Sequence, residues 1–456
     1  MKKAIKLSLA AALVGSAMLQ AADIDINGYR GGTLDLMLKG MTVLDDKNNG
    51  FAPSNGSGYL IKLKYETPDV WVDGLKAGVG MYVNGDAGLT DWDKSSAAEG
   101  WDKGAYGMVV DEDGESKALM GELYLSYKHK YFDAKFGRQT LETPLTQIQT
   151  SLMPNFYEAY MLGTNAIDGL RLTAGQITKM SIGSRGAPDW GIIGEKTGTA
   201  GVGAELLSQG GTVEQAKFYN IGTIAGVDST SGRTVVGATY TGVKNLQADL
   251  WAYHSDDIAN DIYAELGYKI PVSEGMAVNL NAQYLMQKDT GDSLAGERDF
   301  KMMGAKIALG TKKWGMYAAF NSSGNEDLAH EGQYFNAWGA DPAYTSSIFS
   351  RNAYRDNVDA YKIGGHYVIM KGLKFMMSYA NYGKSDSTLG GVTKTTGNTA
   401  LEDAYEVDTV LVYKPSKEWM FKIFNARRLS EFNGRALAST PERRQNHYRA
   451  IASYTF

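Results

Sequence analysis

Apolar and polar residues alternate with a period of two along much of the chain. The pattern is clearest in residues 59–65, 122–128 and 278–286, where every second position is apolar and most positions between are polar. A period of two places successive side chains on opposite faces of a β-strand. The chain is therefore predicted to form strands with one apolar and one wet face, as in a soluble sandwich or a membrane barrel.

The lengths of the connections distinguish these two folds. Every second connection is a short turn, and most of the others are long, polar and glycine-rich. The strands are expected at about 24–36, 58–66, 75–83, 118–129, 131–139, 156–164, 169–178, 232–241, 246–254, 261–269, 276–287, 299–309, 313–321, 358–369, 373–382, 403–413, 418–428 and 446–456. Short periplasmic turns and long extracellular loops are typical of bacterial outer-membrane barrels. The predicted fold is all-β, a closed transmembrane antiparallel β-barrel of about eighteen strands.

A weak repeat marks several of the short turns. A turn residue precedes the first apolar residue of a strand in Asp73-Gly74-Leu75, Asp168-Gly169-Leu170, Lys244-Asn245-Leu246 and Lys371-Gly372-Leu373. Such turns also occur in other β proteins. The repeat supports the predicted strand starts without proving the barrel.

The N-terminus predicts a signal peptide over residues 1–21, followed by a single barrel over residues 22–456. A charged start precedes an apolar stretch over residues 7–19 and a small residue, Ala21, that suits a cleavage site. No later stretch approaches the roughly 18 apolar residues that a transmembrane helix needs. A membrane location would therefore require strands.

Charge and composition exclude several function classes. Removing the three lysines of residues 1–21 leaves 43 of the 46 basic residues against 51 acidic ones, a net charge of −8. This balance argues against a nucleic-acid partner. The chain has no cysteine, and its 5 histidines are scattered without metal-ligand spacing. We expect no catalytic residue, no metal and no cofactor, so an enzyme is not predicted.

The C-terminus resembles the assembly signal of Gram-negative outer-membrane barrels. The last predicted strand alternates up to Tyr454 and the final residue, Phe456. The expected location is thus the outer membrane of a Gram-negative bacterium. The expected partners are the barrel assembly machinery, outer-membrane lipid and lipopolysaccharide.

Apolar-outward alternation places a set of cations on the inner face of the barrel. The pore-lining candidates are Lys62, Lys64, Lys135, Arg171, Lys306, Lys362, Lys374, Lys422, Arg428 and Arg449, with His366. Fewer acids share that face, namely Glu122, Asp133, Asp249, Glu265 and Asp408. An excess of cations would attract anions. Alternatively the charges cancel in pairs, and a one-residue register error would reverse any assignment.

Charge in the loops leaves further alternatives open. Residues 84–117 hold nine acids against three lysines, which could attract cations or bind a hard metal, or could simply be solvated.

Several short motifs share a pattern with known sequences, among them Phe136-Gly137-Arg138-Gln139, Leu152-Met153-Pro154, Ile167-Asp168-Gly169-Leu170-Arg171-Leu172, Ala343-Tyr344-Thr345-Ser346 and Gly372-Leu373-Lys374-Phe375. The segments that carry these motifs cover roughly a quarter of the chain and resemble the OprD-type outer-membrane porins. The resemblance implies a monomer or loose trimer with constriction loops at about 140–155 and 322–357, and a basic ladder for solutes that carry a carboxylate. The constriction-loop candidates are Glu142, Gln147, Gln149, Ser151, Asn155, Tyr344 and Ser346.

The constriction motif departs from the family pattern. The family usually has an Asp and an Arg just before a Leu-Leu-Pro motif, whereas Gln149 and Ser151 occupy those positions here. A less charged constriction would suit a more general channel or a different solute. The predicted function is a porin for passive diffusion of ions and small hydrophilic solutes, with a structural or adhesive barrel or a barrel hydrolase as the alternatives.

Overall fold

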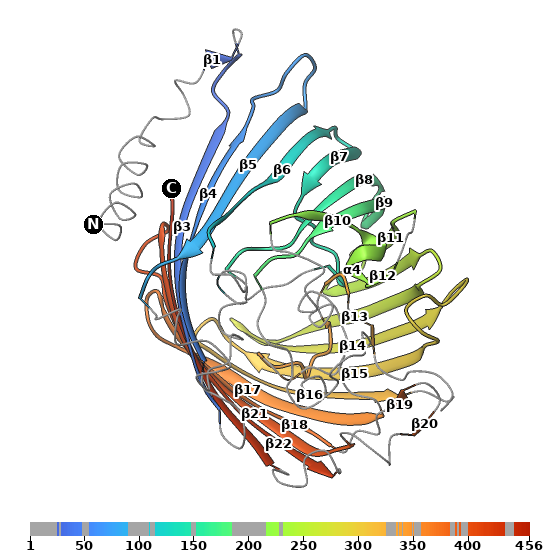
Figure 1. Cartoon of the computed structure of the whole chain (residues 1–456), viewed down its shortest axis with the longest axis vertical. Helices are drawn as coiled ribbons and strands as arrows, with labels where there is room; N and C mark the ends of the chain where they lie inside the picture. The colour runs from blue at the N-terminus through green and yellow to red at the C-terminus, as the bar shows by residue number, and fades with distance from the viewer. Residues whose placement is uncertain are drawn as a thin grey trace.

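The chain forms a closed antiparallel β-barrel (Figure 1). The computed structural model describes residues 25–26, 29–47, 54–89, 109, 115–146, 152–184, 216–227, 231–324, 334–335, 337–339, 341–348, 350, 357–383, 388–389, 392–393, 400–433 and 442–456. The predicted signal peptide lies outside these residues, so it stays a prediction. Within the described part of the chain, no helix is long and apolar enough to cross a membrane.

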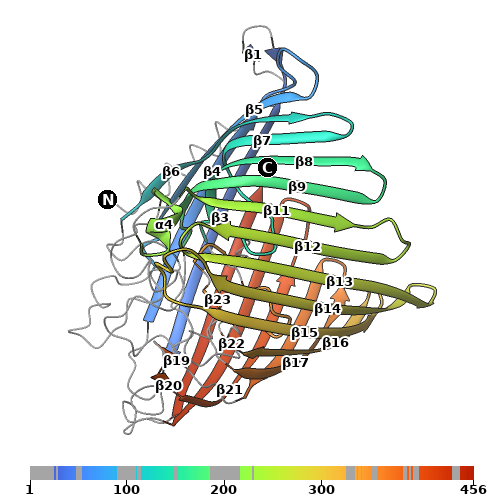
Figure 2. The ribbon, with the colours of Figure 1, turned by 90° about the vertical axis from the view of Figure 1, so that its right-hand side faces the viewer.

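Eighteen of the described strands build the barrel, as the alternation predicted. They are β3(Thr33–Lys47), β4(Ser54–Glu66), β5(Leu75–Asp86), β6(Lys117–Lys128), β7(Phe132–Gln139), β8(Phe156–Ile167), β9(Leu170–Ser181), β11(Arg233–Tyr240), β12(Leu246–Ser255), β13(Ala259–Ser273), β14(Met276–Asp289), β15(Asp299–Gly310), β16(Trp314–Gly324), β17(Val358–Met370), β18(Leu373–Tyr382), β21(Ala400–Tyr413), β22(Trp419–Asn433) and β23(Glu442–Thr455). Each pairs antiparallel with its neighbours, and β23 pairs with β3 to close the sheet. Figure 2 shows the short turns at one end of the barrel and the longer connections at the other.

Smaller elements lie outside the main ring of strands. β1(Asp25–Ile26) and β2(Tyr29–Arg30) form one two-stranded sheet, and β19(Thr388–Leu389) and β20(Val392–Thr393) form another. β10(Phe218–Asn220) extends β9 and leads into α4(Ile221–Ile224), a single helical turn. β1 and β2 therefore precede the barrel, β19 and β20 lie in the connection between β18 and β21, and β10 adds a short segment to the edge of β9.

The predicted start of the barrel at residues 24–36 is wrong. The first barrel strand, β3, runs from Thr33 to Lys47 and pairs with β4 and β23 over most of that length. Clean alternation ends near Gly40 because the inner positions Met41 and Val43 are apolar and are buried by an inserted loop. β3 therefore continues beyond residue 40, although its inner residues there are no longer polar.

The predicted turn repeat corresponds to left-handed backbone at the short turns. Gly74, Gly169, Asn245 and Gly372 have φ values of 85°, 72°, 65° and 82°. Glycine and asparagine adopt this region most readily. The leucine after each of these residues begins an outward-running strand.

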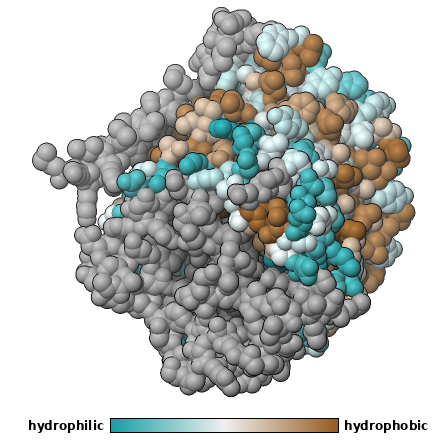
Figure 3. Space-filling model, turned by 45° about the vertical axis from the view of Figure 1, so that its right-hand side comes forward, coloured by the Kyte–Doolittle hydropathy of each residue, from teal (hydrophilic) through white to brown (hydrophobic). Residues whose placement is uncertain are grey.

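The outer wall is apolar, as expected for a surface in contact with lipid. Leu123, Ile307 and Ile363 are 50%, 51% and 59% exposed, and apolar side chains gather on the wall visible in Figure 3. Near the turn end, the Trp419 ring lies 5.4 Å from Phe421 and 5.0 Å from Tyr454, centroid to centroid. Aromatic residues at this level form the girdles of outer-membrane barrels.

Candidate channel lumen

The loop between β16 and β17 lies inside the barrel and is held there by side chains of the wall. Gln287 on β14 binds the backbone of Phe335 twice, with Phe335 N donating at 2.6 Å and Gln287 Nε2 donating to Phe335 O at 3.1 Å. Asn321 on β16 accepts from Thr345 N at 3.0 Å. Glu406 on β21 accepts from Ser350 N at 2.7 Å. The loop is therefore anchored at strands far apart along the wall.

A buried arginine gives the same loop an aromatic anchor. Arg233 on β11 is 1% exposed, and its Nη2 lies 2.7 Å from Asp261 Oδ2. Its guanidinium carbon lies 4.7 Å from the ring centre of Tyr253 and 4.4 Å from that of Trp338, a loop residue. A planar guanidinium suits both the carboxylate and the aromatic faces. Arg233 thus ties the loop to β11, β12 and β13.

The β16–β17 loop also meets the β7–β8 loop at a tight junction. The Tyr157 hydroxyl, on β8, lies 2.7 Å from the carbonyl oxygens of both Thr146 and Trp338, which belong to different loops. A Cβ added at Gly339 would lie 1.8 Å from Leu145 O, so this approach requires glycine. The two loops are in direct contact inside the lumen.

The β7–β8 loop contributes to two apolar clusters on different parts of the wall. Leu141 and Leu145 pack with Trp338 and with Ile221 and Ile224 of α4. Leu152 and Met153 pack instead with residues of β3, β4 and β22. Between these segments, residues 147–151 lie outside the described part of the chain. This loop therefore contributes to both clusters on the inner side of the wall.

All the predicted pore-lining cations lie on the inner face of the barrel. They belong to the strand positions opposite to the exposed apolar residues of the outer wall. Several are paired across the wall: Lys62 with Asp35, Lys64 with Glu122, Arg171 with Asp133, and Lys362 with Asp408. Lys362 also donates to Ser346 O at 2.7 Å, so it serves the inserted loop.

Other cations contact aromatic rings rather than carboxylates. Lys135 Nζ lies 3.8 Å from the centre of the Tyr124 ring, and Lys306 Nζ lies 4.9 Å from that of Tyr317. Among the described residues, no carboxylate is within ion-pair distance of Lys135, Lys306, Lys374 or Lys422. The inner wall is thus neutralised in part only.

Three cations converge on β22, β23 and β3, which are consecutive in the wall. Lys422 Nζ and Arg449 Cζ lie 5.2 Å and 5.0 Å from the ring centre of Phe424. Lys39 is close enough to both for their charges to interact, and its Nζ donates to Leu152 O at 3.5 Å. We call Lys39, Lys422 and Arg449 the cation cluster; through Lys39 it contacts Leu152 of the β7–β8 loop.

The constriction-loop candidates have different surroundings. Glu142 is exposed, whereas Asn155 is buried and accepts from Gly183 N at 2.9 Å. The Tyr344 hydroxyl donates to Glu265 at 2.7 Å, and Ser346 Oγ donates to Asp341 at 2.6 Å. Burial raises the pKa of Tyr344, and the hydrogen bond to Glu265 adds to this effect. Gln147, Gln149 and Ser151 lie outside the described residues.

Sequence reasoning missed several inner residues. Lys39 lies beyond the predicted end of the first strand at residue 36. Arg233 lies on a strand whose next inner residue, Val235, is apolar and buried, so alternation did not show its inner face. Asp261 shares the face of the predicted inner residue Glu265, but it was not included among the inner acids. The described residues contain no group of three or more metal-ligating side chains.

Comparisons with known proteins agree with this architecture. A family model described as outer membrane porin, OprD family, matches residues 76–456. No curated protein matches the chain significantly. Among solved structures, Pseudomonas aeruginosa OpdL is 16% identical with a TM-score of 0.64, and the match covers 93% of this chain and 98% of the OpdL chain. Pseudomonas aeruginosa OpdK with vanillate is 14% identical with a TM-score of 0.65 and the same coverage. Acinetobacter baumannii OccAB3 is 14% identical with a TM-score of 0.68, and the match covers 93% of this chain and 99% of the OccAB3 chain.

Proposed function

The chain belongs to the OprD family of outer-membrane porins, and from this premise we propose that its channel favours small solutes that carry a carboxylate. Family and fold place the protein in the outer membrane of a Gram-negative bacterium, as a channel for small solutes. The preference for carboxylates goes further and rests on the charges of the inner wall. The structure of OpdK with vanillate, a carboxylate, is consistent with this preference in a relative.

The observation that carries the proposal is the cation cluster beside the β7–β8 loop. Lys39, Lys422 and Arg449 add positive charge to the inner wall next to Leu152 of this loop. Lys135, Lys306 and Lys374 add further charge along the same inner face without a carboxylate partner among the described residues. A low-dielectric wall with one sign of charge raises the local concentration of the opposite ion.

Single-channel recording in a planar bilayer tests the proposal. With a salt gradient, the reversal potential is expected to show anion preference, and Lys422→Met is expected to weaken it. Lys417→Met is the matched control, because Lys417 lies in the turn between β21 and β22 and is exposed. A cation preference would overturn the proposed solute class, and no current from folded protein would overturn the channel itself.

Rates of solute entry distinguish the effect of a solute's carboxylate from the effect of its size. In liposome swelling assays, benzoate is expected to enter faster than benzamide, which has nearly the same size without the charge. The difference is expected to shrink in Lys422→Met and to persist in Lys417→Met. Equal rates for the two solutes in the unmodified protein would contradict a carboxylate preference and leave the channel intact.

We also propose that the barrel assembly machinery recognises the C-terminal strand, and that the barrel is a monomer or loose trimer. Tyr454 packs on Trp419, and Phe456 is 49% exposed at the turn end of the barrel. Phe456→Ala is expected to lower the amount of folded protein in the outer membrane. Unchanged amounts would contradict the recognition, and mass photometry of the purified protein reports its oligomeric state.

A further inference from the structure

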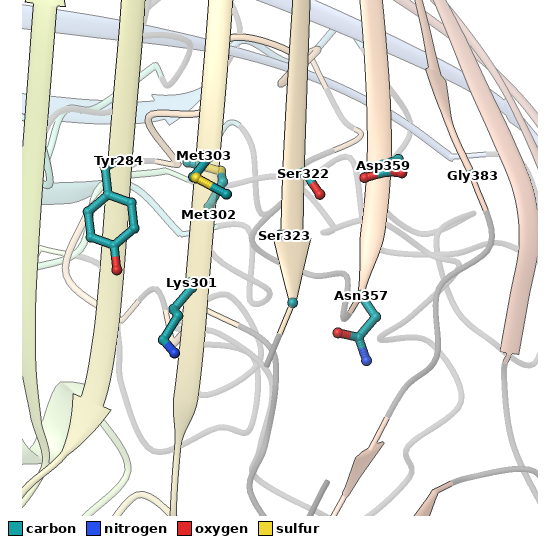
Figure 4. Close-up of a pocket in the computed structure, with 10 residues that line it drawn as sticks. Tyr284, Lys301, Met302, Met303, Ser322, Ser323, Asn357, Asp359 and Gly383 are labelled. Atoms are coloured by element: carbon teal, nitrogen blue, oxygen red, sulfur yellow. The ribbon is translucent and has the colours of Figure 1, made fainter. Parts of the chain in front are cut away.

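A groove crosses the outer wall at the loop end of β14, β15, β16, β17 and β18 (Figure 4). Its volume is about 610 Å³, within the range of pockets that bind small ligands. Tyr284, Lys301, Ser322, Asn357 and Asp359 contribute side chains to its lining. We call this feature the rim groove.

The rim groove faces lipid rather than the lumen. Lys301 lies two residues before Met303 on β15, and Asp359 lies two residues before Tyr361 on β17, so each pair shares one face of its strand. Met303 and Tyr361 are 63% and 56% exposed on the outer wall. Ser322 lies two residues before the end of β16. The loop end of an outer-membrane barrel is the extracellular end. The groove therefore lies at the level of lipid headgroups in the outer leaflet.

The hollow arises because small residues lie on both sides of β17. Ser322 and Gly324 belong to β16, Gly383 directly follows β18, and Asp359 of β17 lies between Ser322 and Gly383. A Cβ at Gly324 would lie 2.6 Å from Asn357 Oδ1, so no side chain fills this position. Tyr284 bounds one side of the groove and Asp359 lies toward the other (Figure 4). The depression is built into the strands themselves.

The lining is chemically mixed, unlike the apolar wall below it. Lys301 supplies a cation, Asp359 an anion, and Asn357, Ser322 and Tyr284 supply amide and hydroxyl groups. A bare phosphate ion would be repelled by Asp359. Sugar hydroxyls need both donors and acceptors, which carboxylate, amide and hydroxyl side chains provide, and a sugar phosphate would attract Lys301.

We propose that the rim groove binds the phosphorylated saccharide head of a lipopolysaccharide molecule in the outer leaflet. The acyl chains then lie on the apolar wall formed by Met303, Tyr361 and Ile363. Lys301 pairs with a phosphate, and Asp359 and Asn357 accept hydrogen bonds from sugar hydroxyls. The site is independent of the channel, because it lies on the opposite face of the sheet from the pore-lining residues.

Native mass spectrometry of the full-length protein tests the proposal. Folded protein in detergent is incubated with purified lipopolysaccharide, and bound molecules are counted. Ser322→Trp fills the groove and is expected to remove one bound molecule. Thr234→Trp is the matched control, because Thr234 is an exposed hydroxyl residue near the loop end of β11, away from the groove. Equal binding by both variants would overturn the site.

Two further arms keep the test decisive. Lys301→Gln and Asp359→Asn change the chemistry of the lining with little change in its volume, and each is expected to weaken lipopolysaccharide binding several-fold. These two variants replace Ser322→Trp in the test if that variant does not fold. Competition with vesicles of phosphatidylethanolamine and phosphatidylglycerol is expected to leave lipopolysaccharide bound. Displacement by these phospholipids would overturn the saccharide as occupant. The single-channel conductance of all these variants is expected to stay unchanged. A negative result for lipopolysaccharide binding can therefore be distinguished from a negative result for the channel proposal.

Discussion

From β11 to β21, inner-wall polar residues bind the inserted β16–β17 loop, whereas on β22 and β23 two cations pack on one aromatic ring, and a third cation, Lys39 on β3, lies near them. Arg233, Gln287, Asn321 and Glu406 on the first wall each contact a loop residue. On the second wall, Lys422 and Arg449 pack on Phe424 of the strand itself. An arginine therefore helps to hold a loop on one side of the barrel, whereas on the other side an arginine adds positive potential to the lumen.

This difference means that charge alone does not identify a selectivity residue. An arginine such as Arg233, buried 2.7 Å from its carboxylate, contributes little electrostatic potential to a passing ion, because the two opposite charges largely cancel at a distance greater than their separation. A lysine without a carboxylate nearby contributes fully. The partners of each inner-wall cation decide its task.

Arg233→Met is expected to have the largest effect, because it leaves the Asp261 carboxylate buried without its cation. Loss of one partner of a buried pair costs about 3–5 kcal/mol, so the free energy of unfolding in denaturant is expected to fall by that amount. Arg233→Met with Asp261→Leu is expected to recover much of the loss. If the double variant is no more stable than the single one, the pair does not act as an anchor.

Tyr344→Phe removes a neutral anchor of the same loop. The hydrogen bond to Glu265 involves a charged acceptor, so its loss is expected to cost about 1.5–3 kcal/mol. Because the pKa of Tyr344 is raised, its contribution to stability is present below the ordinary phenol pKa of about 10 and is lost only as the pH rises through the raised value. Tyrosinate absorbance near the ordinary phenol pKa of about 10 is therefore expected to report the same number of titrating tyrosines in the unmodified protein and in Tyr344→Phe. One titrating tyrosine fewer in the variant would contradict this prediction.

Gly339→Ala tests the contact between the two inserted loops. The added methyl group would overlap Leu145 O, and overpacking of this kind costs about 1–3 kcal/mol. The loops are expected to separate, with a higher single-channel conductance as the result. Gly275→Ala is a matched control, since a Cβ there meets no atom within 4 Å, although its φ of 75° adds backbone strain. Equal conductance for unmodified protein and Gly339→Ala would place the narrowest point elsewhere.

Removing a neutral pair should change selectivity least. Lys62→Met with Asp35→Leu deletes one cation and one anion that contact each other. The reversal potential is therefore expected to move much less than in Lys422→Met. A shift as large as that of Lys422→Met would remove the distinction between paired and unpaired cations.

Sequence patterns were sufficient for the fold, the family and the location, because alternation and turn chemistry are local properties. Gly74, Gly169 and Gly372 mark turns wherever the rest of the chain goes. The alternation failed at Met41, Val43 and Val235, which are apolar and buried on the inner face. Inserted loops cover these positions, and no local pattern shows which part of a wall a loop will cover.

The anchors could not be predicted for the same reason. Arg233 and Trp338 are distant in sequence, and their contact depends on how the β16–β17 loop folds back against β11. Tyr344 and Ser346 were chosen from the resemblance, but their partners Glu265 and Asp341 were not identified. Lys39 required the correct bounds of β3. Long-range packing, rather than residue preference, decided these positions.

The seam between β23 and β3 has a consequence for folding kinetics. Thr455 pairs with Met37, so the two edges that meet are about 420 residues apart, whereas most other strand pairs are joined by a turn or a single loop. The entropy of closing so long a chain grows slowly, by about 0.6 kcal/mol per doubling of length, but contacts between distant residues form late. We therefore expect an open sheet with two unpaired edges as the last intermediate, and its lifetime sets how long the nascent barrel is exposed to aggregation.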